Sequence, residues 1–163
     1  MKLKLSIYSS AFLCFMSIVI LSCKKEEKTN EKLFDETSAS DLRFYQNKDS
    51  ILSPAGSSPH GSFKLKFNSI AVNQFGADGK LPAGGEFKDG SLIVKEVYTG
   101  GVLSLYAMMK KDSKSKFAGN GWLWAEYKPD GETVFSAGKK GDGCISCHSS
   151  GTHRDLTLSF DLH

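Results

Sequence analysis

The sequence FKLKFN at residues 63–68 alternates apolar with polar side chains. Successive side chains of a β-strand point to opposite faces of the sheet, so this period of two predicts a half-buried strand. The sequence WLWAEY at residues 122–127 places Trp122, Trp124 and Glu126 on one face in the same manner. These two segments are strong strand candidates, and they indicate the fold class.

Further strand candidates lie at residues 92–98, 102–109 and 133–137, and glycine-rich turn sequences separate them. The longest such connection, residues 76–90, holds five glycines and one proline. No segment between the strand candidates has a helical period of 3.6, although residues 41–47 could form one or two helical turns. We therefore predict a mainly β fold of the β-rich α+β class, an antiparallel sheet with short helices.

The first residues have the pattern of a secretory signal. Lys2 and Lys4 precede an almost uncharged run at residues 5–21, which is short for a membrane-spanning helix. The run ends in the sequence ILSC at residues 20–23, which resembles a bacterial lipobox, whose cysteine sulfur receives a diacylglycerol. We expect lipid on Cys23, and the alternative is an uncleaved anchor helix in which this cysteine has no role.

This pattern predicts three parts: a lipoprotein signal peptide at 1–22, a flexible charged tether at 23–40 and one domain at 41–163. The protein is expected to be exported and to contact a membrane through its lipid alone, facing the periplasm. The chain has 21 basic and 18 acidic residues and a net charge of +3. That balance provides no concentrated basic face, so we expect no nucleic-acid partner.

The sequence CISCH at residues 144–148 has the spacing of a c-type haem attachment motif. Two thiols at this spacing can form thioethers with the two vinyl groups on one porphyrin edge, and the adjacent histidine can then ligate the iron. Because Cys14 lies in the signal and Cys23 is the lipidation candidate, Cys144 and Cys147 form the one remaining pair. We predict one covalent haem c per chain, with His148 as axial ligand.

Three other interpretations of this motif are open. A redox disulfide of the thioredoxin type favours a βαβ setting, whereas the strands predicted here are antiparallel. A zinc site using both cysteines and a histidine such as His153 requires ligands from well-separated points. The third alternative is a lipoprotein without haem, whose cysteines are structural.

Several segments resemble the cytochrome P-460 family in their order and spacing. They are SPHG at 58–61, FKDGSLIVKE at 87–96, AMMK at 107–110, GWLWAEY at 121–127 and the late haem motif. The resemblance covers roughly residues 58–160 and is close to the cytochromes c-prime-beta. It implies an antiparallel β domain with one haem c, an iron with an open distal side, and possible homodimers. Its members either bind small gases or oxidise hydroxylamine or nitric oxide.

In the oxidising members, a lysine is bonded to the porphyrin rim. The matching position in this chain is occupied by Pro82 and Ala83, with Lys80 nearby, and we find no clear counterpart of the distal catalytic carboxylate. The favoured function is therefore binding of a small gaseous or nitrogen-oxide ligand, electron transfer to a periplasmic redox partner, or both. The alternative is an enzyme of the oxidising type.

Several residues of the sequence are candidates for the open side of the haem. An apolar wall would admit diatomic gases and disfavour anions and water. His60, Met108 and Met109 could each supply a sixth ligand, although a turn position for the histidine and core packing for the methionines are the better explanations. The distal-pocket candidates are Phe63, Phe67, Phe75, Phe87 and Lys80.

Overall fold

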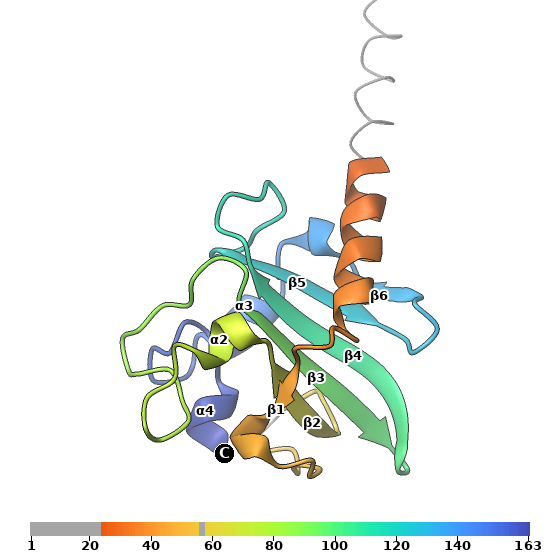
Figure 1. Ribbon diagram of the computed structural model, residues 1–163. Coiled ribbons are helices and arrows are strands. Elements are labelled where there is room, and N and C mark those ends of the chain that lie inside the picture. Colours follow the sequence, from red (N-terminus) through yellow and green to blue (C-terminus); the bar gives the residue numbers. More distant parts are fainter. Residues whose placement is uncertain (1–23, 56–57) are drawn as a thin grey trace, which may run out of the picture.

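A computed structural model describes residues 24–55 and 58–163 of the chain. Its centre is a six-stranded antiparallel sheet in which every strand pairs with its neighbours in sequence, in the order β1-β2-β3-β4-β5-β6 (Figure 1). The strands are β1 (Arg43–Phe44), β2 (Ser62–Phe67), β3 (Leu92–Thr99), β4 (Val102–Lys111), β5 (Trp122–Tyr127) and β6 (Thr133–Phe135). The predicted β-rich α+β fold is confirmed.

The helical elements around the sheet are short. They are η1 (Tyr45–Asn47), α2 (Ser69–Val72), η2 (Ala137–Lys139), α3 (Cys144–His148) and α4 (Ser159–Leu162). Residues 41–47, for which one or two helical turns were expected, contain β1 and the single 3-10 turn η1 instead. Pairing of Arg43 and Phe44 with the edge of β2 explains the extended part of this segment.

The strand register aligns side chains in rows across the sheet. One row runs from Leu65 on β2 through Lys95 and Ala107 to Glu126 on β5. Residues that pair across neighbouring strands point to the same face, so these four side chains share one side of the sheet. All four residues line one cavity.

Each face of the sheet carries its own apolar core. On the face with Leu65, a core that includes Phe67 and Trp122 packs against the C-terminal segment through Phe160, which is 1 % exposed. On the other face, Val94 and Tyr127 belong to a second core, which also contains Leu33. The sheet is therefore covered on both sides, because strands with apolar side chains on both faces must be buried on both.

Residues 24–36, predicted as part of a flexible tether, are helical (Figure 1, orange). Leu33 is 2 % exposed in the second core, the side-chain amide oxygen of Asn30 accepts from the amide of Ala137 at 3.0 Å, and Glu36 pairs with Lys110 at 2.6 Å. The many charges of this segment concealed a helical period of buried positions. The polar composition alone was therefore a poor guide to flexibility.

The predicted signal peptide at 1–22 and the lipidation candidate Cys23 lie outside the described residues. Among the residues that the structure describes, no helix has the length and apolarity needed to cross a bilayer.

Candidate haem site

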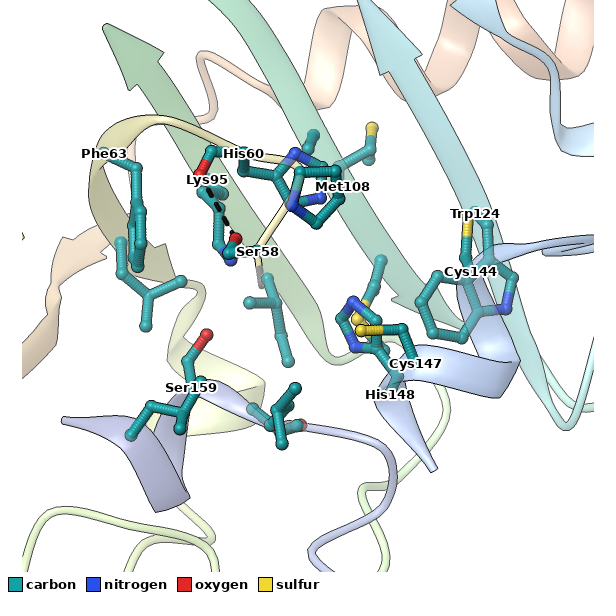
Figure 2. A pocket seen from close by; sticks show the side chains of 18 of the residues that line it. Ser58, His60, Phe63, Lys95, Met108, Trp124, Cys144, Cys147, His148 and Ser159 are labelled. Atoms are coloured by element: carbon teal, nitrogen blue, oxygen red, sulfur yellow. Dashed lines mark hydrogen bonds between the residues drawn. The ribbon is translucent and has the colours of Figure 1, made fainter. Parts of the chain in front are cut away.

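A cavity of about 560 Å³ lies between the sheet and the C-terminal segment, a volume within the range of about 300–1,000 Å³ that is typical of ligand and cofactor sites. Its sheet wall is formed by side chains of β2 to β6. Its opposite wall is formed by α3 and by residues 157–163. Figure 2 shows His60, Phe63 and Lys95 on the sheet side, facing Cys147 and His148 on α3. All three residues of the predicted haem motif line this cavity: Cys144, Cys147 and His148.

A glycine-dependent turn delivers α3 to the cavity. The carbonyl of Gly141 accepts from the amides of Cys144 at 2.9 Å and of Ile145 at 3.1 Å, which starts the helix. Gly141 has a φ of +73°, and a Cβ there would lie 2.6 Å from Cδ1 of Trp124. A glycine is required because both the left-handed backbone and the close approach to the indole exclude a side chain.

Both cysteines of α3 are free thiols, Cys144 partly buried and Cys147 exposed. Burial, followed by the nearby Glu126 carboxylate, raises the pKa of the Cys144 thiol. The pair therefore offers two uncommitted sulfur atoms at the edge of a cavity. This arrangement suits thioether formation with a planar macrocycle bound inside.

The imidazole of His148 is oriented by two contacts. Its Nδ1 lies 2.7 Å from the carbonyl oxygen of Leu156, and its ring meets that of Trp124 edge-on, with centroids 5.0 Å apart and planes at 81°. Because a carbonyl only accepts, Nδ1 carries the proton and the lone pair is on Nε2. Burial lowers the pKa of this imidazole, which favours the neutral form that binds metals. The residues present therefore fit a haem iron ligated by His148.

The carbonyl that holds His148 follows a buried charged residue. The carboxylate of Asp155 accepts from Nζ of Lys111 at 2.8 and 2.7 Å, from Nε1 of Trp122 at 3.1 Å and from the amide of Phe87 at 2.8 Å. Its side chain is 8 % exposed, and that of Lys111 is 9 % exposed. This network ties the segment after α3 to β4 and β5.

Polar side chains on the sheet side of the cavity include Lys95, His60 and Glu126. The ammonium of Lys95 lies over the ring of Phe63, 4.2 Å from its centroid, and burial lowers the pKa of Lys95 to about 8. His60 Nδ1 lies 3.9 Å from Oε1 of Glu126. Burial, reinforced by the neighbouring Lys95 and His148, lowers the pKa of His60 to about 4, and burial raises the pKa of Glu126.

The distal-pocket candidates divide between the cavity and its surroundings. Phe63 lines the cavity. Phe67, Phe75 and Phe87 belong to the adjoining aromatic core, where Phe67 stacks on Phe160 with centroids 5.5 Å apart. Because Phe67 points to the same face of β2 as Phe63, this core lies beside the cavity.

The remaining candidates are Lys80 and the two methionines. The ammonium of Lys80 donates to the carbonyl of Phe160 and is not among the cavity-lining groups of the described residues. Met108 and Met109 line the cavity, and they belong to the cores on opposite faces of the sheet. Lys95 was not identified from the sequence. The one signal for it was its position on β3, where the residues two positions before and after it also face inward.

A family model described as Cytochrome P460 matches residues 43–159. The matched segment contains all six strands, α3 and the residues that fix His148. No curated protein matches the chain.

Proposed function

The chain belongs to the cytochrome P460 family and is therefore a haem-binding cytochrome, and from this premise we propose that it is an exported, lipid-anchored carrier of one covalent haem c. Cys144 and Cys147 would form the thioethers, and His148 would be the axial ligand. Bound haem supplies an iron that exchanges an electron and takes up a small ligand. The observation that carries the proposal is the 2.7 Å hydrogen bond from His148 to Leu156, beside two free thiols at a cavity.

The chain's own residues would keep one side of the iron available. His148 comes from α3, and the wall facing it consists of sheet side chains and of His60. We propose that a small nitrogen-oxide or diatomic ligand binds on that side, and that electrons pass to a periplasmic redox partner. The contact between Trp124 and His148 supports a ring held in one orientation, which is what a stable axial bond needs.

Export and lipid anchoring rest on the sequence. The basic start, the apolar run at 5–21 and the lipobox-like residues 20–23 support them. A Cys23→Ala variant should lose incorporation of labelled palmitate, whereas the matched variant Cys14→Ala should retain it. Labelling that persists without Cys23 would contradict the anchor.

One observation favours the oxidising enzyme as a second candidate. Glu126 and His60 lie 3.9 Å apart at the cavity wall, and together they could accept protons from a bound substrate. A carboxylate of this kind was not identified from the sequence. This activity would be supported if the protein turned over hydroxylamine or nitric oxide and Glu126→Gln abolished the turnover. A haem peptide with a third covalent link, to a lysine, would also support it.

Haem attachment is tested by producing the chain in a host with haem-attachment machinery. Denaturing electrophoresis followed by haem staining should show a coloured band, and Cys144→Ser combined with Cys147→Ser should abolish it. Ser146→Ala, within the same motif, is the matched control. His148→Gly should keep the stained band, change the absorption spectrum and regain the original spectrum with added imidazole. A wild-type protein without the stained band would refute the proposal.

A further inference from the structure

Lys95 differs from the other strand lysines in having no carboxylate partner in the part of the chain that the structure describes. Each of the other four lysines in the described strands forms an ion pair: Lys64 with Asp49, Lys66 with Glu96, Lys110 with Glu36 and Lys111 with Asp155. Lys95 lies on β3 and lines the cavity, and within the described residues no acceptor hydrogen-bonds its ammonium. Among the residues at 24–55 and 58–163, it contacts the ring of Phe63, and the Cys147 thiol is near enough to interact with it electrostatically.

A partly buried ammonium without a counter-charge is unfavourable unless a ligand supplies one. The cation–π contact with Phe63 compensates only in part, since the face of an aromatic ring carries only a partial negative charge. With a pKa of about 8, Lys95 is still mostly protonated at neutral pH. The cavity therefore contains a positive charge to which the described residues offer no carboxylate partner.

The sheet leaves room beside this charge. Lys95 and Glu126 belong to one row, with the small side chain of Ala107 between them. Two strand spacings of about 4.8 Å separate their backbones, and all three residues line the cavity, as does His60 near Glu126. A ligand above Ala107 would contact the Lys95 ammonium on one side. Because Glu126 on its other side is acidic, the negative charge of the ligand would face Lys95.

We propose that Lys95 is the anion-binding residue of the cavity, and that the space above Ala107 takes a small inorganic anion such as nitrite. This inference rests on the proposed function, because the anion would occupy the side of the iron opposite His148. It also replaces the expectation of an apolar wall that disfavours anions. A single ammonium matches a singly charged ligand, and Phe63 and Leu65 limit its size.

The test compares anionic with neutral ligands on the full-length haem protein. Azide and nitrite are titrated into the ferric form and carbon monoxide into the ferrous form, each followed by absorbance. Lys95→Met should weaken binding of both anions by about 10- to 100-fold, because a charge-assisted hydrogen bond is lost. Lys95→Arg should restore most of the affinity, and carbon monoxide binding should change by less than about threefold.

Lys64→Met is the matched control, because it removes the same charge from a strand lysine that does not line the cavity. It should leave every affinity unchanged. If Lys95→Met does not fold, Lys95→Gln provides the same comparison. Unchanged anion affinity, as expected if a haem carboxylate already pairs with Lys95, would overturn the inference, and so would an equal loss for anions and carbon monoxide. Failure of the proposed function is separate, because the wild-type protein would then contain no attached haem.

Discussion

Replacing Asp155 by asparagine tests whether the buried charge network holds the haem-motif segment on the sheet. The substitution keeps the shape and one oxygen acceptor, but removes the charge that pairs with Lys111. Both side chains are less than one-tenth exposed, so the Lys111 ammonium would be left in a place that water reaches poorly. Breaking a buried pair in this way costs about 3–5 kcal/mol.

We expect the lower end of that range, about 3 kcal/mol, because the asparagine oxygen can still accept from Trp122 or Phe87. For a domain of this size, that loss lowers the melting temperature by roughly 10 °C. Urea unfolding followed by tryptophan fluorescence measures the change, since Trp122 is itself in the network. Asp35→Asn, at an exposed position of the N-terminal helix, is the control and should change stability little.

A double-mutant cycle with Lys111→Met separates the charge pair from general packing. The double variant should be more stable than the sum of the two single losses predicts, because no unpaired charge is left buried. A loss below about 1 kcal/mol in Asp155→Asn, or strict additivity in the cycle, would refute the reasoning.

Three further outcomes are expected. Leu33→Ala should lower the free energy of unfolding by about 2–5 kcal/mol in urea titrations, since Leu33 is 2 % exposed; a neutral result would mean that the helix at 24–36 does not pack on the sheet. Gly119→Ala should lower the free energy of unfolding by at least about 2 kcal/mol, because its Cβ would lie 1.8 Å from the Lys140 carbonyl oxygen. Gly61→Ala is the control and should be tolerated, because its Cβ would meet its neighbours at 3.5 Å or more. Burial lowers the pKa of His60 to about 4, so the unfolded chain binds a proton before the folded chain does, and the free energy of unfolding falls as the pH drops from about 7 towards 4. At pH 5, His60→Gln should therefore retain about 2 kcal/mol more of its neutral-pH stability than the wild type does, and an equal pH dependence of the two proteins would contradict this.

The antiparallel sheet was predictable because its evidence is local. Alternation at 63–68 and 122–127 and the intervening glycine turns require only neighbouring residues, and every strand pairs with the next one in sequence. The haem motif is equally local, being one five-residue stretch. The order of these pieces also carried the resemblance to the cytochrome P-460 family, which the family match over residues 43–159 confirms.

The long-range features of the site were not predictable. That Asp155 accepts from Lys111 depends on contacts between residues 44 positions apart, and no local pattern marks either residue. The inward direction of Lys95 depends on the pairing register of β3 with β2 and β4. The helix at 24–36 escaped notice because its buried residue, Leu33, is surrounded by charged neighbours.

The serial order of the sheet has a consequence for biosynthesis. All six strands precede α3 in the chain, and each hairpin can close as soon as its second strand leaves the ribosome. Short-range pairings of this kind form quickly. The wall that carries Lys95 and Glu126 would thus be assembled before α3 emerges, so that α3 and the residues after it would close the cavity against a surface that is already in place.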